Sequence, residues 1–116
     1  MKTVVFVCEH GAFRSRIAAA YFNACAPPGW RAMSAGKEPQ PEVSTRVGAL
    51  LAGEHVQLET GAPRPFSAVS GDHIIALDCD APADERWSLA GGNDKALRDE
   101  IRRRVVAFAK ELSRRA

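Results

Sequence analysis

The sequence predicts an α/β fold built on a parallel sheet, because short apolar runs of β-forming residues alternate with segments of helical character. The clearest run is Val4-Val5-Phe6-Val7, and a helical segment, residues 14–25, follows it. Further strands are expected at residues 30–35 and 73–77. Such alternation implies right-handed crossovers and a sheet covered by helices on both faces. With 116 residues the chain has room for one domain, residues 1–116.

The first half of the chain contains two predicted helices with clear boundaries. In the first, one face is expected to consist of Ile17, Ala20, Tyr21 and Ala24, and Pro27-Pro28-Gly29 ends the helix. The second strand then ends at Gly36. Pro39 and Pro41 mark a loop and the start of a second helix, whose apolar positions Val43, Val47, Leu50 and Leu51 recur at helical spacing up to Gly53.

The second half begins with an extended connection, residues 61–65, where Pro63-Arg64-Pro65 excludes regular structure. The third strand ends at Asp78-Cys79-Asp80, and residues 86–89 form a short, weak fourth strand. Asn93 or Asp94 is expected to cap the last helix. One stripe of that helix is apolar and consists of Leu97, Ile101, Val105, Phe108 and Leu112.

The segment Cys8-Glu9-His10-Gly11-Ala12-Phe13-Arg14-Ser15 predicts an anion site between the first strand and the first helix. Amide N–H groups at a helix start are unpaired and carry the positive end of the helix dipole. Cys8 would lie at the base of this loop and the Arg14 guanidinium at its rim. In parallel sheets, ligands bind beyond the carboxyl ends of the strands, where this loop is expected. The chemistry indicated is displacement at phosphorus or arsenic by a cysteine thiolate.

Composition sets limits on the environment and the partners. The formal net charge of +2 does not favour nucleic-acid binding, and the basic residues of the last helix are interleaved with acidic ones, as on a solvated face. We expect no signal peptide and no membrane span. Cys8, Cys25 and Cys79 suggest neither a disulfide framework nor a metal site, so a reducing cytoplasm is expected. His10, His55 and His73 have no ligand-like spacing.

Several of these motifs resemble those of a known family. Val-Phe-Val-Cys, five residues, and then Arg-Ser at a helix start resemble the low-molecular-weight protein tyrosine phosphatases and the thioredoxin-coupled arsenate reductases of the same fold. Ser34-Ala35-Gly36, the third strand and Arg98-Asp99-Glu100-Ile101 support this resemblance. It implies a three-layer α/β fold with a four-stranded parallel sheet in the order 2-1-3-4, and an enzyme that uses no cofactor.

The resemblance also implies roles for the loop residues. Cys8 would attack a phosphotyrosyl or other aryl phosphate monoester and form a cysteinyl-phosphate. The backbone of Glu9, His10, Gly11, Ala12 and Phe13, together with Arg14, would hold the phosphate oxygens, and Ser15 would donate its hydroxyl to the thiolate. The expected ligand is therefore phosphate or another oxyanion, and the expected partner is a phosphotyrosyl protein. The oligomeric state stays open.

The chain departs from the family pattern in several places. Glu9 opposes anion binding unless its side chain points to solvent or pairs with a cation, for which His10 is a candidate. Gly11 replaces an asparagine but can adopt the same left-handed backbone. Phe13 replaces a cysteine. No Asp-Pro pair supplies the usual general acid, so Asp94 is the nearest candidate, with Asp78 and Asp80 as weaker ones.

Three functions remain open from the sequence. The first is a metal-independent aryl phosphatase. The second is an arsenate reductase, in which Cys79 would act as the resolving thiol although no further cysteine follows it. The third is a non-catalytic oxyanion-binding protein, for which Glu9 and the missing acid argue. Cys25 is expected to be a small core residue of the first helix, and Cys79 to be a packing or loop residue unless it serves that relay.

Overall fold

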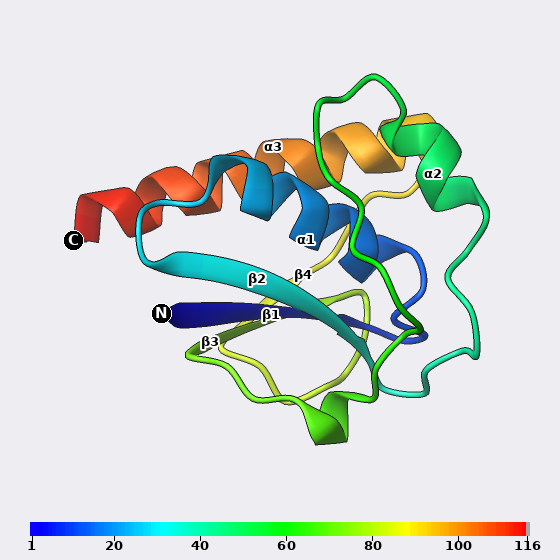
Figure 1. The fold of residues 1–116 in the computed structure, drawn as a ribbon, viewed down its shortest axis with the longest axis horizontal. Coiled ribbons are helices and arrows are strands. Elements are labelled where there is room, and N and C mark those ends of the chain that lie inside the picture. Colours follow the sequence, from blue (N-terminus) through cyan, green and yellow to red (C-terminus); the bar gives the residue numbers. More distant parts are fainter. Residues whose placement is uncertain (116) are drawn as a thin grey trace.

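Four parallel strands form the sheet in the computed structural model, which describes residues 1–115 (Figure 1). The strands are β1 (Lys2–Cys8), β2 (Trp30–Gly36), β3 (His73–Leu77) and β4 (Glu85–Trp87), and their order is β2-β1-β3-β4. The predicted fold class and strand order are thereby confirmed. The last residue of the predicted domain, Ala116, lies outside the described residues.

β1 is a central strand, and every residue of it after Lys2 is buried. Its apolar run is continuous rather than alternating because both faces of a parallel sheet are covered. Pairing with β2 places Cys8 directly opposite Gly36, while Val7 lies opposite Ala76 of β3. The carboxyl ends of β1 and β2 therefore meet at one edge of the sheet.

Three α-helices lie on one side of the sheet: α1 (Arg14–Cys25), α2 (Arg46–Leu51) and α3 (Asp94–Arg115) (Figure 1). α1 packs against β1, β2 and α3, and α2 contacts both other helices. Between the sheet and these helices lies the main core, in which the rings of Phe6, Phe22, Phe108 and Trp87 pack with centroids 5.9–6.3 Å apart. The whole predicted apolar stripe of α3 is buried there.

The opposite face of the sheet has a lighter cover than the sequence predicted. A one-turn 3-10 helix, η1 (Phe66–Ala68), lies below the sheet in Figure 1, and its Phe66 packs near Val7 and Ala76. The predicted extended connection, residues 61–65, precedes it and forms no helix. Helical cover on this face is thus limited to a single 3-10 turn.

Several predicted boundaries were wrong by a few residues. α2 begins at Arg46 rather than at Pro41, and the residues before it instead bind the loop after β1 through the Gln40 and Ser44 amides. β4 covers 85–87 instead of 86–89. α3 is capped by Asn93, whose Oδ1 accepts a hydrogen bond of 2.8 Å from the Ala96 amide.

The last turn of α1 also differs from its predicted role. Ala24 and Cys25 are exposed, whereas Phe22 is fully buried. The helix ends where the chain leaves the core toward Pro28, so the apolar face stops one turn earlier than the spacing suggested. Cys25 is therefore not a core residue. Within residues 1–115, no helix is both long and apolar enough to cross a membrane.

Candidate active site

The predicted loop lies beyond the carboxyl end of β1 and leads directly into α1. It borders a pocket of about 160 Å³. The lining comes from the loop, from the segment before α2 and from the first residue of α2, and comprises Cys8, Glu9, His10, Ala12, Phe13, Arg14, Gln40, Ser44 and Arg46. Cys8 and Arg14 thus share one concave site.

The peptide groups of the loop are held by hydrogen bonds on their carbonyl side. The carbonyls of Cys8, Glu9, His10 and Ala12 accept from amides of the segment between β2 and α2, at 2.8–3.1 Å, and the Phe13 carbonyl accepts from Ile17. In a trans peptide the carbonyl and the next N–H point in opposite directions. The amides that follow these carbonyls therefore face the inside of the loop.

Those amides are available to a ligand. Within residues 1–115, the N–H groups of residues 9–13 donate no hydrogen bond to a protein acceptor. The start of α1 adds to this set, because no side chain caps it. Gly11 has a φ of +64°, the left-handed conformation predicted for it, which lets the chain curl around a point. Inward-facing amides at a helix start are an anion-binding arrangement.

Cys8 lies at the base of the loop and is 5% exposed. Its Sγ is 3.2 Å from the Ser15 Oγ, which is itself fully buried. Arg14, the first residue of α1, lies at the rim, and its Nε is 3.3 Å from Oδ2 of Asp78 at the end of β3. This contact lacks hydrogen-bond geometry, so the Nε remains without a hydrogen-bond partner in the described chain. Asp78 positions the Arg14 side chain by charge.

Glu9 and His10 do not pair with each other. Both are exposed, and the His10 ring is 3.3 Å from the Glu38 carbonyl. Lys37, which forms an ion pair with Asp80, is close to Glu9: the bond with Asp80 and the charge of Glu9 both raise the pKa of Lys37. The carboxylate of Glu9 is thus directed to solvent and lies in the field of a cation, which reduces its opposition to an anion in the loop.

Phe13 and Asp94 are linked through Arg46. The Arg46 guanidinium lies 4.2 Å from the centre of the Phe13 ring. Its Nη1 also donates to both oxygens of Asp94, at 2.8 and 2.9 Å. Asp94 does not line the pocket, but its partner Arg46 does. The structure therefore brings Asp94 close to the predicted site without placing it over Cys8.

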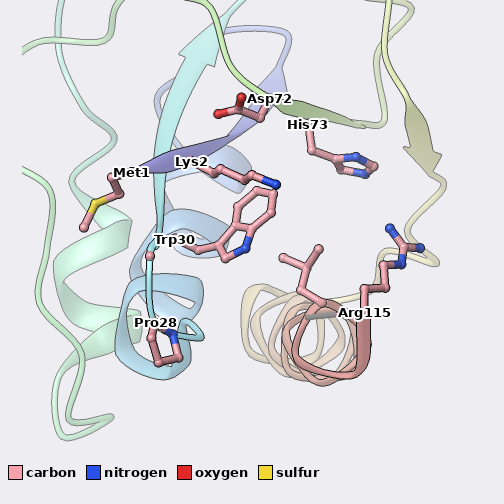
Figure 2. A pocket seen from close by; sticks show the side chains of 9 residues that line it. Met1, Lys2, Pro28, Trp30, Asp72, His73 and Arg115 are labelled. Carbon is pink, nitrogen blue, oxygen red and sulfur yellow. The ribbon is translucent and has the colours of Figure 1, made fainter.

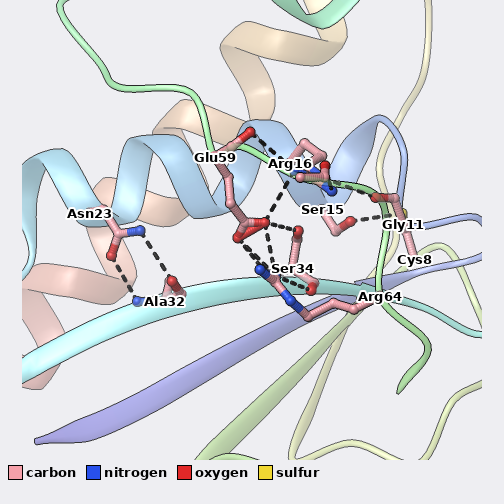
Figure 3. Close-up of polar contacts among 10 residues, drawn as sticks. Cys8, Gly11, Ser15, Arg16, Asn23, Ala32, Ser34, Glu59 and Arg64 are labelled. Atoms are coloured by element: carbon pink, nitrogen blue, oxygen red, sulfur yellow. Dashed lines mark hydrogen bonds and ion pairs between the residues drawn. The ribbon is translucent and has the colours of Figure 1, made fainter. Parts of the chain in front are cut away.

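The sequence interpretation missed a buried ionic cluster behind the loop (Figure 3). Arg16 is 2% exposed, and it binds Glu59 and Gly61 on the segment that precedes η1. Glu59 also accepts hydrogen bonds from Ser34 and Arg64. Burial lowers the pKa of Arg16, and the charge of Glu59 opposes this change. The sequence signal for this cluster was an arginine, Arg16, within an apolar helix face. Its partner Glu59 could not be identified from that signal, because it lies more than forty residues away in the sequence.

Cys79 lies on the other side of the sheet from Cys8. Cys8 belongs to the core cluster that packs under the helices, whereas Cys79 packs with Val7, Ala76 and Ala81 on the opposite face. Its Sγ is 3.5 Å from the Val7 carbonyl, and burial raises the pKa of its thiol. Among residues 1–115, no group of three or more His, Cys, Asp or Glu side chains is arranged to hold a metal ion.

A larger hollow, of about 560 Å³, lies at the opposite edge of the sheet (Figure 2). It is lined by Lys2, Trp30 and His73, which begin β1, β2 and β3, and by Arg115 of α3. The amino ends of parallel strands are remote from the loop after β1. This hollow is larger, but within residues 1–115 the Cys8 thiol, the free loop amides and the Arg14 guanidinium come together at the smaller pocket.

Comparisons with known proteins identify the family of the chain. The family model described as low molecular weight phosphotyrosine protein phosphatase matches residues 3–95. An arsenate reductase from Archaeoglobus fulgidus is 31% identical, with a TM-score of 0.79, and the match covers 92% of this chain and 98% of that chain. A search of curated proteins gave no significant match.

Two further solved structures show the same fold. The thioredoxin-dependent arsenate reductase of Corynebacterium glutamicum is 24% identical, with a TM-score of 0.85, over all of this chain and 64% of that chain. The YwlE arginine phosphatase of Geobacillus stearothermophilus is 17% identical, with a TM-score of 0.75, over 99% and 95% of the two chains. Because the family model covers most of the chain, the protein belongs to the low molecular weight phosphotyrosine protein phosphatase family.

Proposed function

We propose that the protein is a cysteine-dependent, metal-independent phosphatase that acts on phosphotyrosine or other aryl phosphate monoesters. The observation that carries this proposal is the placement of the Cys8 sulfur, 3.2 Å from the Ser15 hydroxyl, at the base of a loop with free amides. The thiolate, not the thiol, is the nucleophile, and a hydroxyl donor together with a helix start stabilises that charge. Arg14 binds the same ligand from the rim through its planar fork.

The reaction proceeds in two displacements. The Cys8 thiolate attacks phosphorus, so that a sulfur–phosphorus bond forms while the bond to the ester oxygen breaks, and that oxygen takes up a proton. Water then attacks phosphorus, the thiolate leaves, and inorganic phosphate is released. In both steps the amides of residues 9–13 and the Arg14 guanidinium hold the equatorial oxygens. Removal of one such preorganised donor typically raises the barrier by about 2.7–4 kcal/mol.

Asp94 is the proposed proton donor for the first step. Its carboxylate is held by Arg46, which lines the pocket, so donation requires Asp94 first to take up a proton from solvent and then to exchange that contact for the leaving oxygen. The Arg46 and Asp94 side chains are 57% and 38% exposed. Ion pairs with this exposure contribute only about 0–1 kcal/mol, so the exchange is inexpensive.

The second candidate is arsenate reduction, which the identity with the Archaeoglobus enzyme favours. This chemistry needs a second thiol to attack sulfur after arsenic is bound, and Cys79 is the nearest cysteine in the fold to serve. Its position on the opposite face of the sheet and its raised pKa both disfavour attack at Cys8 without a rearrangement of the segment after β3. The phosphatase needs no such rearrangement.

Hydrolysis of p-nitrophenyl phosphate by the wild-type protein, Cys8→Ser and Cys25→Ser tests the proposal. We expect Cys8→Ser to abolish turnover, since loss of a nucleophile costs on the order of 10⁶-fold in kcat in well-studied cases. Cys25→Ser removes an exposed thiol of α1 and should leave the rate unchanged. Equal rates in the wild type and Cys8→Ser would exclude the phosphatase.

A parallel assay distinguishes the two candidates. Arsenate is supplied with thioredoxin, thioredoxin reductase and NADPH, and arsenite is measured for the wild type and Cys79→Ser. The phosphatase proposal predicts ester hydrolysis that is unaffected by Cys79→Ser and little arsenite. Arsenite production that disappears in Cys79→Ser, without ester hydrolysis in the wild type, would establish the reductase instead.

A further inference from the structure

Arg16 is the largest fully buried side chain of the described chain, and the proposed chemistry does not use it. It follows Ser15 in the first turn of α1 and turns back beneath the loop, where its Nε donates to the Gly11 carbonyl at 3.4 Å. The other end of the guanidinium donates to the carbonyls of Glu59 and Gly61, at 3.1 and 2.9 Å. Figure 3 shows these contacts between the loop and the Glu59 segment.

The Gly11 carbonyl is the exception among the peptide groups of the loop. Backbone amides hold the carbonyls of Cys8, Glu9, His10, Ala12 and Phe13. At Gly11 a side chain, that of Arg16, takes the place of the backbone donor. The Gly11–Ala12 peptide is also the one for which rotation is easiest, because Gly11 has no side chain to restrict it.

We propose that Arg16 is a positioning residue for the oxyanion site. By holding the Gly11 carbonyl on the outer side of the loop, Arg16 directs the Ala12 N–H toward the phosphate. Without it, that peptide can rotate and present a carbonyl oxygen to the anion. The inference rests on the proposed use of the loop as a phosphate site.

The charge of Arg16 supports the same role. Burial lowers the pKa of Arg16, whereas the charges of Glu59 and of a Cys8 thiolate both favour its protonated guanidinium. Glu59 balances this charge from the far side, with Oε2 3.4 Å from Nη1 of Arg16, and is shared with Arg64. The cluster thus places a fixed cation behind the anion site, and its two arginines and one glutamate carry a net formal charge of +1.

The test measures binding of inorganic phosphate by calorimetry to the wild type, Arg16→Met, Arg16→Lys and Arg64→Met. We expect Arg16→Met to weaken phosphate binding about tenfold or more, as expected for loss of a hydrogen bond to a charged ligand. Arg16→Lys keeps the charge, but its compact ammonium cannot span the Gly11 and Gly61 carbonyls, so its affinity should fall between the other two.

Arg64→Met is the matched control. Arg64 shares Glu59 with Arg16 and binds the Ser34 carbonyl, but its side chain makes no hydrogen bond to the loop. Arg64→Met should lower the Tm, because it removes the ion pair with Glu59, yet leave phosphate affinity unchanged. The rate of Cys8 alkylation by iodoacetamide, measured in a Cys25→Ser/Cys79→Ser background, should fall in Arg16→Met and stay constant in Arg64→Met.

Two results separate this inference from the proposed function. A folded Arg16→Met or Arg16→Lys protein that binds phosphate as tightly as the wild type would overturn the positioning role, whatever the activity. A wild-type protein that binds phosphate, loses it in Arg16→Met, and hydrolyses no aryl phosphate would retain the positioning role and exclude the phosphatase. If Arg16→Met does not fold, the comparison of Arg16→Lys with Arg64→Met decides.

Discussion

The contact between Gly11 and Gly36 determines where the loop lies. A Cβ on Gly11 would be 2.7 Å from the Gly36 amide nitrogen, and a Cβ on Gly36 would be 2.6 Å from the nitrogen of Gly11. The loop is therefore pressed against the carboxyl end of β2 with no room for a methyl group. This contact explains why Ser34-Ala35-Gly36, which supported the family resemblance, ends in glycine. It also could not be deduced from local sequence, because the two glycines meet only when β1 and β2 pair.

Substitution of Gly36 tests this contact. We expect Gly36→Ala to lower the free energy of unfolding by about 1–3 kcal/mol, because the added methyl group overlaps backbone that cannot move freely. Phosphate affinity should fall as well, since the loop has to shift. Gly48→Ala is the control: its added Cβ would meet nothing within 4 Å, and in α2 it should raise stability by roughly 0.4–1 kcal/mol. Urea unfolding and phosphate calorimetry measure both effects, and equal behaviour of the two variants would contradict the close approach.

At the scale of one element, the start of α3 shows which of two neighbouring residues caps the helix, a question that the sequence left open. Asn93 caps the helix through the Ala96 amide, and Asp94 in the first turn is held by Arg46 of α2. The spacing predicted the helix and its buried stripe well, since a long amphipathic pattern depends only on neighbours within the helix. The partner of Asp94 was not predictable, because Arg46 reaches it through the tertiary fold.

Substitutions at these neighbouring positions should therefore affect different properties, stability at Asn93 and turnover at Asp94. Asn93→Ala should lower the free energy of unfolding by about 1 kcal/mol and leave turnover unchanged, because it removes only a cap. Asp94→Asn should change stability little. It should slow hydrolysis of phenyl phosphate by on the order of 10²-fold, and that of p-nitrophenyl phosphate less, because the poorer leaving group depends more on a proton donor.

Urea unfolding and steady-state kinetics on the two esters measure both variants. Asp94→Asn with unchanged rates on both substrates would remove Asp94 from the mechanism and leave the role of Cys8 intact. A rate loss in Asn93→Ala as large as that in Asp94→Asn would instead show that both positions act through the fold of α3.

At the scale of the whole molecule, the two faces of the sheet are unequal. The apolar runs and their alternation with helices predicted the parallel sheet, and the loop after β1 predicted the place of the site. The second face has a lighter cover than the first, because residues 53–72 contain several glycines and prolines and form only η1. The burial of Arg16 and the exposure of Cys25 were likewise set by chain segments distant in sequence, which local patterns do not report.

This asymmetry predicts different costs for two neighbouring residues of β3. Ile75 is fully buried in the core under the helices, whereas Ile74 is half-buried and packs against the small cluster on the other face. Ile75→Ala should lower the free energy of unfolding by about 2–5 kcal/mol, because the surrounding side chains leave a cavity. Ile74→Ala removes the same atoms from the same strand but buries less apolar area, so its loss should be smaller by at least about 1 kcal/mol. Urea unfolding of both variants measures the difference. Equal losses would mean that the face with η1 is packed as tightly as the helical face, and that the sheet has two comparable cores.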